Sequence, residues 1–390
     1  MKKIILSAAS LAVAAVASVS VAPTTSEAIP AFARQTGSAC LACHFQSFPT
    51  LAAYGRAFKM GGMTDSARDM VEDEHLSIPA TLNWTVMVRP NWFSDDDGTG
   101  GPGAKTKGFE FADQVFMIGG RGGEHSGVFV EYDGTYANAQ LINSYDMGDL
   151  KAGWTVWNAG FGEDAGMQVM SVWGQHGGML GGKSLSINNS MGTDQSQGIA
   201  VWAGNDTWVA QLGFVDTVGD GTGGVDLGGE WKYAPVLRGN YFLEAGDFEV
   251  GIGAIIATGS AGQVAGNTVD TKRTGIDVQA FGDMGDMQIG ILADFATAPA
   301  SSTGTANYYN ASTTDSRTGY SFRVTVKPVA QWIFLAGIGQ DKTGAAKTDK
   351  TRIGVEYEMY QNFAVQLIYS TEKTAAGTAK STLIDLELLI

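Results

Sequence analysis

Residues 198–216 read Gly-Ile-Ala-Val-Trp-Ala-Gly, then Asn205-Asp206, then Thr-Trp-Val-Ala-Gln-Leu-Gly-Phe-Val-Asp. Two runs rich in aromatic and β-branched residues flank a short polar turn, which is the pattern of an antiparallel β-hairpin. The stretch therefore predicts two paired strands with a tight turn at Asn205-Asp206.

The same rhythm recurs along most of the chain. From about Ser77 apolar and polar residues alternate, as in Leu82, Trp84, Val86 and Val88. Further turns are expected at 244–247, at 282–285, near Lys327-Pro328 and at 360–362, and the chain ends on an alternating strand. Segments of roughly ten alternating residues separated by turns are typical of outer-membrane barrels. We predict an all-β fold, a transmembrane antiparallel β-barrel of about 16 strands over residues 76–390.

Aromatic residues and long loops fit this interpretation. Trp and Tyr recur near the expected strand ends, as aromatic girdles do at the two membrane interfaces; they are Trp84, Trp92, Trp208, Trp231, Tyr233, Tyr241, Tyr320, Trp332, Tyr357 and Tyr369. The stretches 94–107, 259–272 and 298–316 are small and polar, and we expect them on the outer face. A soluble β-sandwich or propeller would show the same period, but the hairpin rhythm over residues 76–390 favours the barrel.

The first 28 residues have the pattern of a secretory signal peptide. Lys2 and Lys3 precede an apolar run, and Ser26-Glu27-Ala28 places small residues around a cleavage site. A retained membrane anchor is the alternative, which the polar residues after Pro23 disfavour. No later segment has the roughly 18 consecutive apolar residues of a spanning helix, so membrane insertion would require a closed barrel.

Charge and composition narrow the functional classes. The formal net charge is −15, and removal of residues 1–28 takes away two lysines and one glutamate, which leaves −16. An acidic chain of this kind disfavours a nucleic-acid partner. With 53 glycines, nine prolines and 44% hydrophobic residues the chain is not disordered, and two cysteines cannot form a disulfide scaffold.

Those two cysteines lie in Cys40-Leu41-Ala42-Cys43-His44. C-x-x-C-H is the pattern for covalent attachment of a c-type haem, with the histidine placed as proximal iron ligand. We predict one covalent haem c held by Cys40 and Cys43, with His44 on the iron. A redox dithiol and a metal half-site are the alternatives.

The remaining haem contacts are open on sequence alone. Met60, Met63 and His75 are candidates for the distal ligand, although single methionines more often fill gaps in cores. Arg34 and Arg56 are candidates to pair with haem propionates, because planar guanidinium groups suit carboxylates. The same arginines are equally suited to anchor this segment to acidic residues.

Residues 29–75 form a separate unit in this interpretation. Leu51, Tyr54 and Phe58 recur at helical spacing, which predicts a short amphipathic helix. A segment this small can hardly support a free-standing core. We expect a monohaem cytochrome c plug that depends on its haem and on an enclosing wall.

The N-terminal run resembles the fused monohaem cytochrome–porins of iron-oxidising bacteria. The matching pieces span about 30 residues and are Pro30, Phe32-Ala33-Arg34-Gln35-Thr36-Gly37, the C-x-x-C-H motif, Pro49, Leu51, Gly55-Arg56 and Phe58-Lys59. The resemblance implies an outer-membrane barrel plugged by a cytochrome, in which Cys40 and Cys43 attach the haem and His44 is its proximal ligand. It also implies that electrons pass from extracellular Fe(II) to a periplasmic cytochrome.

We therefore expect a protein of the cell outer membrane, in contact with its lipid, that transfers one electron at a time from Fe(II) as an Fe(II):cytochrome c oxidoreductase. Two alternatives remain. The first is a porin-like solute channel whose haem plug is structural or sensory. The second is a conduit for a different electron donor or acceptor.

Overall fold

The structure is a computed structural model, and it describes residues 30–47, 49–101, 103–134, 137–158, 166–170, 185–191, 196–217, 232–262, 268–302 and 304–390. The predicted signal peptide (residues 1–28), Ile29 at the start of the predicted plug and Trp231 of the predicted aromatic girdles lie outside the described residues.

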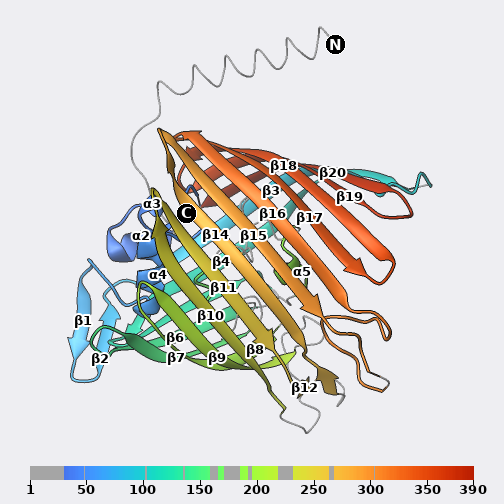
Figure 1. Cartoon of the computed structure of the whole chain (residues 1–390). Helices are drawn as coiled ribbons and strands as arrows, with labels where there is room; N and C mark the ends of the chain where they lie inside the picture. The colour runs from blue at the N-terminus through green and yellow to red at the C-terminus, as the bar shows by residue number, and fades with distance from the viewer. Residues whose placement is uncertain are drawn as a thin grey trace.

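A closed antiparallel barrel makes up most of the molecule, as Figure 1 shows. Its sixteen described strands are β3 (Trp84–Asp96), β4 (Lys105–Gly123), β5 (Ser126–Tyr132), β6 (Ala137–Asp146), β7 (Lys151–Asn158), β8 (Ser196–Gly204), β9 (Trp208–Thr217), β10 (Ala234–Ala245), β11 (Phe248–Ala257), β14 (Arg273–Met284), β15 (Met287–Ala298), β16 (Arg317–Val329), β17 (Trp332–Thr343), β18 (Ala346–Tyr360), β19 (Phe363–Lys373) and β20 (Thr378–Leu389). The last strand pairs with the first, with Leu388 opposite Val88, so the ladder has no free edge. The predicted fold class is confirmed.

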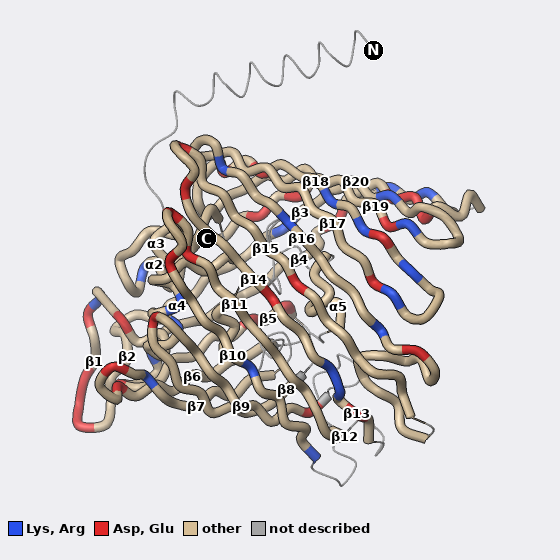
Figure 2. The backbone as a smooth tube through the Cα atoms, viewed as in Figure 1, with Lys and Arg blue, Asp and Glu red and all other residues tan. Residues whose placement is uncertain are grey.

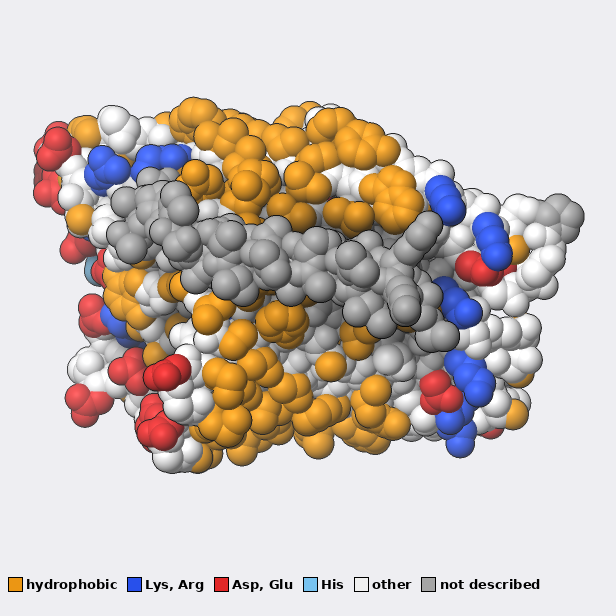
Figure 3. Space-filling view, turned by 90° about the horizontal axis from the view of Figure 1, so that it is seen from above, with side chains coloured by type: hydrophobic (Ala, Val, Ile, Leu, Met, Phe, Trp, Pro, Cys, Tyr) orange, Lys and Arg blue, Asp and Glu red, His pale blue; other side chains and the backbone are white. Residues whose placement is uncertain are grey.

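Strand alternation separates lipid-facing from lumen-facing side chains. On β10 the buried residues Arg238, Asn240 and Phe242 alternate with exposed Leu237 and Tyr241. A period of two places alternate residues on opposite faces of the wall. Hydrophobic side chains cover the middle of the wall, and charged side chains gather at its two ends (Figure 3). An outward apolar band on a closed barrel is the architecture of an outer-membrane protein.

The predicted turns largely coincide with the observed ones. β8 ends at Gly204 and β9 begins at Trp208, which confirms the turn at Asn205-Asp206. The turn expected near Lys327-Pro328 lies slightly further along the chain, because both residues belong to β16 and the chain turns between Val329 and Trp332. The ladder shifts register between Val326 and Val329. Such a bulge accommodates a proline, which has no N–H to donate to the ladder.

The two ends of the barrel differ. Seven short turns join β4–β5, β6–β7, β8–β9, β10–β11, β14–β15, β16–β17 and β18–β19 at the end where β3 begins and β20 ends. The longer connections occupy the other end, where the small strands β12 (Ser260–Gly262) and β13 (Thr268–Asp270) pair, although a two-residue turn joins β17 to β18 there. In outer-membrane barrels short turns face the periplasm and long loops face outward. The stretch expected as a loop at 94–107 is shorter, since β3 extends to Asp96 and β4 starts at Lys105.

Three short helices form the N-terminal plug: α2 (Pro30–Thr36), α3 (Cys40–Cys43) and α4 (Ala53–Met60). They lie at the short-turn end of the barrel (Figure 1). A two-stranded hairpin, β1 (Met70–Asp73) and β2 (Leu76–Pro79), follows them and is not part of the barrel ladder. This hairpin runs across the boundary that we expected at 75/76, and the barrel itself begins at Trp84. Within the described ranges, no helix has the length and apolar character required to cross a bilayer.

A second segment also lies inside the lumen. The helix α5 (Ile187–Met191) contacts β15, β16 and β17. The Asp294 carboxylate accepts hydrogen bonds from Ser186 Oγ (2.6 Å) and Asn188 N (2.9 Å). The described part of the lumen is therefore filled at two levels, by the plug and by α5.

Candidate haem site in the plug

The C-x-x-C-H motif forms α3 and the residue after it. Cys40 and Cys43 bound a four-residue helix, and the backbone N–H of His44 donates to Cys40 O. His44 then turns to an extended conformation and pairs with Leu51 in an isolated bridge. Both thiols and the imidazole are buried. The motif is thus held in one short turn inside the plug.

A tight return loop joins the motif to α4. Phe45 N donates to Thr50 O at 2.8 Å, and Ala52 N donates to Cys43 O at 2.9 Å. α4 then packs directly on α3, because a Cβ at Gly55 would overlap the carbonyl oxygen of Cys43. Glycine is therefore required at this helix contact.

Burial sets the protonation of the motif. It raises the pKa of the Cys43 thiol to about 11, so the thiol stays protonated near neutral pH. Burial lowers the pKa of the His44 imidazole to about 4, against the opposing hydrogen bonds to the backbone of Thr50 and Pro49. Neutral imidazole is the form that ligates a metal. A redox dithiol would instead have a lowered thiol pKa.

These residues fit a covalent haem c. The donor set offers two thiols on one helical turn, next to a buried and neutral imidazole. That is the chemistry that thioether attachment and proximal ligation require. Within the described residues no group of three or more His, Cys, Asp or Glu is arranged to hold a bare metal ion.

The three distal candidates have different environments. Met60 and Met63 are buried in the core between plug and wall. His75 lies in the turn between β1 and β2, with 91% of its side chain exposed, and its nearest ionic neighbour is Glu74 at 3.9 Å. The structure thus places both methionines inside the plug and His75 outside it.

Sequence reasoning missed two further methionines in the same core. Met167 and Met170 pack in the cluster that contains Met60, Met63 and Trp202. They come from residues 166–170, which fold into the lumen. Three of these five residues, Met167, Val169 and Met170, are buried apolar side chains. This short apolar run was the only sequence signal for the segment.

The two arginine candidates anchor the plug to the wall. Arg34 Nη2 donates to the carbonyl oxygen of Trp84 on β3. The Arg56 guanidinium reaches Glu249 of β11 at 2.5 Å and lies 4.1 Å from the ring centroid of Phe242. The Arg56–Glu249 pair matches the anchoring alternative, whereas Arg34 is held by a backbone oxygen and not by an acidic residue. Propionate pairing stays a prediction for both.

Further contacts distribute the plug around the wall. They join plug atoms to strands or turns on several sides of the barrel: Ala31 N to Thr85 Oγ1 (2.9 Å), Gln46 Nε2 to Gln288 O (2.9 Å), Lys327 Nζ to Gln46 O (2.6 Å), Ser144 Oγ to Met60 O (2.6 Å), Leu41 N to Gln361 Oε1 (3.3 Å) and the stacked rings of Phe45 and Phe281 (4.6 Å). The plug is fixed by wall residues rather than by a core of its own.

The lumen around the plug is strongly polar. Arg238 and Asp277 form a fully buried bidentate pair between β10 and β14. Lys327 pairs with Glu358, and Arg89 pairs with Asp385 at 2.6 Å. A polar interior beneath an apolar outer band is typical of porin-like barrels.

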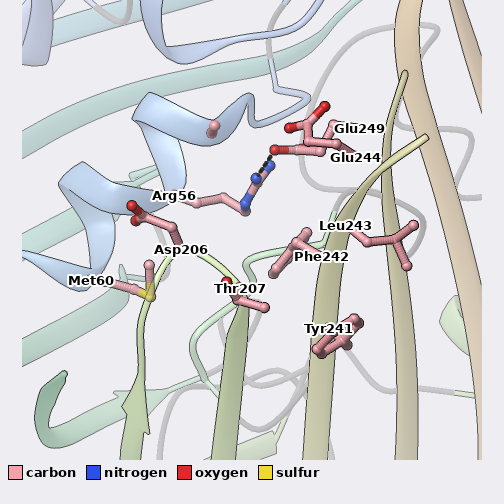
Figure 4. A pocket seen from close by; sticks show the side chains of 10 residues that line it. Arg56, Met60, Asp206, Thr207, Tyr241, Phe242, Leu243, Glu244 and Glu249 are labelled. Carbon is pink, nitrogen blue, oxygen red and sulfur yellow. Dashed lines mark hydrogen bonds and ion pairs between the residues drawn. The ribbon is translucent and has the colours of Figure 1, made fainter. Parts of the chain in front are cut away.

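A cavity of about 450 Å³ opens where α4 meets the wall (Figure 4). Its plug side is formed by Ala53, Arg56 and Met60, which share one face of α4. Its wall side comprises the turn at Asp206-Thr207 and residues 241–244 and 249. The Cys43 contact lies on another face of α4, at Gly55, so the cavity and the haem motif are separated by this helix.

Solved porins have a similar fold. OmpT of Vibrio cholerae, folded in vitro, is 12% identical and matches with a TM-score of 0.50 over 82% of this chain and 99% of its own. The anion-selective porin of Comamonas acidovorans is 9% identical, with a TM-score of 0.49 over 80% of this chain and 99% of its own. OccK2 of Pseudomonas aeruginosa is 10% identical, with a TM-score of 0.46 over 79% of this chain and 97% of its own.

No family model matches the sequence, and no curated protein matches it. The similarity to OmpT therefore concerns the fold alone. Together with the closed ladder and the outward apolar band, it identifies the chain as a porin-like β-barrel of the outer membrane.

Proposed function

We propose that the protein is an electron conduit of the outer membrane, with one haem c attached at Cys40 and Cys43 and ligated by His44. The donor would be extracellular Fe(II) and the acceptor a periplasmic cytochrome. The observation that carries the proposal is the position of a buried C-x-x-C-H motif on a plug inside a closed barrel.

The residues of the chain would divide the work as follows. Cys40 and Cys43 hold the cofactor covalently, and the neutral imidazole of His44 supplies the proximal nitrogen. The haem, when bound, supplies one-electron chemistry. The plug, its wall contacts and α5 exclude bulk water from the lumen, so electrons rather than solutes are favoured to cross.

The choice of Fe(II) rests on the resemblance of the N-terminal run to the cytochrome–porins of iron-oxidising bacteria. Because the plug lies at the short-turn end, an outside donor must deliver its electron through the outer half of the barrel.

Proteoliposomes with the long loops facing outward test the proposal. External Fe(II) should produce the absorption spectrum of reduced haem c, and an internal cytochrome c should then become reduced. A Cys40→Ala/Cys43→Ala double variant should fold as a barrel, lack covalent haem and transfer no electrons. If external Fe(II) leaves the haem oxidised while dithionite reduces it, iron oxidation is excluded.

The second candidate is a solute channel. Its support is the charged lumen, with buried pairs such as Arg238–Asp277, and the porin-like fold. Planar-bilayer recordings separate the two functions: a channel requires ion conductance by the haem-loaded protein, whereas a sealed conduit requires its absence.

A further inference from the structure

The cavity between α4 and the wall carries an unsatisfied donor. Arg56 is 3% exposed, and its Nη1 has no hydrogen-bond partner in the described structure. Its Nη2 is held by Glu249, and its guanidinium lies over Phe242. Figure 4 shows the side chain extending from α4 across the cavity towards Glu249. A buried arginine N–H without a partner is costly, so it indicates an acceptor supplied from outside.

The wall side of the cavity carries two carboxylates outside any described ion pair. Asp206 and Glu244 are exposed, and neither forms an ion pair with any residue that the structure describes. They lie on neighbouring hairpins, since β9 pairs with β10. The cavity therefore combines two exposed carboxylates with one buried N–H that has no hydrogen-bond partner among the described residues.

The surrounding face of the molecule is acidic. Each short turn from β4–β5 to β14–β15 contains an acidic residue: Glu124, Asp149, Asp206, Asp247 and Asp286. The β1–β2 hairpin adds three consecutive acidic residues, Glu72, Asp73 and Glu74. Asp and Glu mark the β1–β2 hairpin and the turns near α4 in Figure 2, and they gather at the plug end in Figure 3. Such a field attracts positively charged proteins and repels acidic ones.

The position of the cavity suits electron transfer. It lies at the short-turn end and is separated from the haem motif only by α4, because Gly55 contacts Cys43 while Arg56 and Met60 line the cavity. A helix with its side chains is about 10–12 Å across. A protein docked at this mouth would therefore be about one helix diameter from the attachment site.

We propose that this cavity is the docking site for a soluble, lysine-rich redox protein of the periplasm. A lysine of that protein enters the cavity, with its ammonium group against Asp206 and Glu244. A neighbouring carbonyl oxygen of the same protein accepts from Arg56 Nη1. A haem held by Cys40, Cys43 and His44 would supply one electron to the oxidised redox centre of the docked protein. The electron-transfer step rests on the proposed function, whereas the docking itself does not.

Binding to the oxidised, detergent-solubilised full chain tests the site without iron. The probe is a lysine-rich mitochondrial cytochrome c, and the same protein with acetylated lysines is its matched control, because acetylation removes the charge. We expect binding of the unmodified probe that weakens as salt is raised, and no binding of the acetylated probe. Equal binding of the two probes would overturn the proposal.

Two double variants distinguish the contribution of the cavity to probe binding from that of the acidic face as a whole. Asp206→Asn/Glu244→Gln should weaken binding by about tenfold, because it removes the two charges that face the docked lysine. Asp283→Asn/Asp286→Asn removes the same charge from the end of β14 and the β14–β15 turn, outside the cavity, and should weaken binding less than about twofold. Equal losses in the two variants, or none in the first, would refute the docking site.

The two proposals fail in distinguishable ways. Haem content and reduction by external Fe(II) are measured on the same variants and should be unchanged, since Asp206 and Glu244 belong to the wall and not to the plug that carries the haem motif. If Fe(II) reduces the haem but the probe shows no charge-dependent binding, the proposed function stands and the docking site is refuted. If the probe binds in a charge-dependent way but Fe(II) does not reduce the haem, only iron oxidation is refuted and the docking site stands.

Discussion

The wall and the plug satisfy their backbones in different ways. Each strand of the wall pairs with two neighbours, and the β20–β3 pair closes the ladder. The plug has helices of seven, four and eight residues, which are shorter than isolated helices that are stable in water. Its polar groups instead find partners on the wall, such as Thr85 and Lys327.

This difference implies that the plug depends on the wall for its stability, whereas the wall does not depend on the plug. A closed barrel contains its own backbone partners, so it can fold and insert without the plug. The plug has few apolar residues packed only against each other; Cys40 and Ala33 form a small separate cluster, whereas Phe58, Met60 and Met63 pack in a core shared with the wall. Wall and haem should therefore stabilise the plug more than the plug stabilises the wall.

Deletion of residues 30–80, with the signal peptide retained, should have the largest effect on haem content and ion conductance. The shortened chain should fold into a heat-modifiable barrel, lack haem and conduct ions, because the short-turn mouth is then open. α5 remains in the lumen, so the conductance should be smaller than that of an open porin. Gel mobility and planar-bilayer recordings measure these outcomes, and a shortened chain that does not fold would show that the wall depends on the plug.

The sequence predicted the wall well because strand period and turn chemistry are local properties. The turn at Asn205-Asp206 follows from polar residues between two apolar runs. The turn near Lys327-Pro328 was misplaced because proline, usually a turn residue, is here accommodated by a bulge inside β16. Local rules identify turn residues, but they do not show when the ladder can absorb one.

The site was predictable only where its residues are neighbours in the chain. Cys40, Cys43 and His44 lie in one motif, and the structure keeps them together in one turn. By contrast, Gln46 and Lys327 are 281 positions apart, and their contact depends on how the barrel closes. Met167 joins Met60 only because residues 166–170 enter the lumen. No local pattern encodes such pairs.

Lys327→Met is expected to have the next largest effect. Lys327 Nζ donates to Gln46 O of the plug at 2.6 Å and pairs with the buried Glu358 carboxylate. Removal of one partner leaves an uncompensated charge, which typically costs about 3–5 kcal/mol. The variant should lose its heat-modifiable form at a lower temperature, and the plug should become more accessible to protease while the wall remains folded.

Lys347→Met is the matched control, because it removes a lysine whose partner Asp349 lies 3.0 Å away in an exposed pair at the other end of the barrel. Exposed pairs contribute about 0–1 kcal/mol, so its unfolding temperature should stay close to that of the parent protein. A Lys327→Met plug that resists protease as well as the control does would show that this anchor is dispensable.

Gly55→Ala is expected to have the smallest effect, and its sign is informative. Helix propensity alone favours alanine over glycine inside α4 by about 1 kcal/mol. The contact with α3 opposes this gain, because the new Cβ would overlap the backbone oxygen of Cys43, and overpacking typically costs about 1–3 kcal/mol. We therefore expect a net loss of plug stability, measured as a lower yield of covalent haem per barrel and faster proteolysis of the plug.

Gly239→Ala on β10 is the control for the added methyl group, since no atom lies within 4 Å of the position that its Cβ would occupy. It should leave haem yield and proteolysis unchanged. If Gly55→Ala raised the haem yield, helix propensity would outweigh the contact, and α3 and α4 would not be in direct contact in the folded protein. The plug would then have more stability of its own than its short helices imply, and its dependence on the wall would be correspondingly weaker.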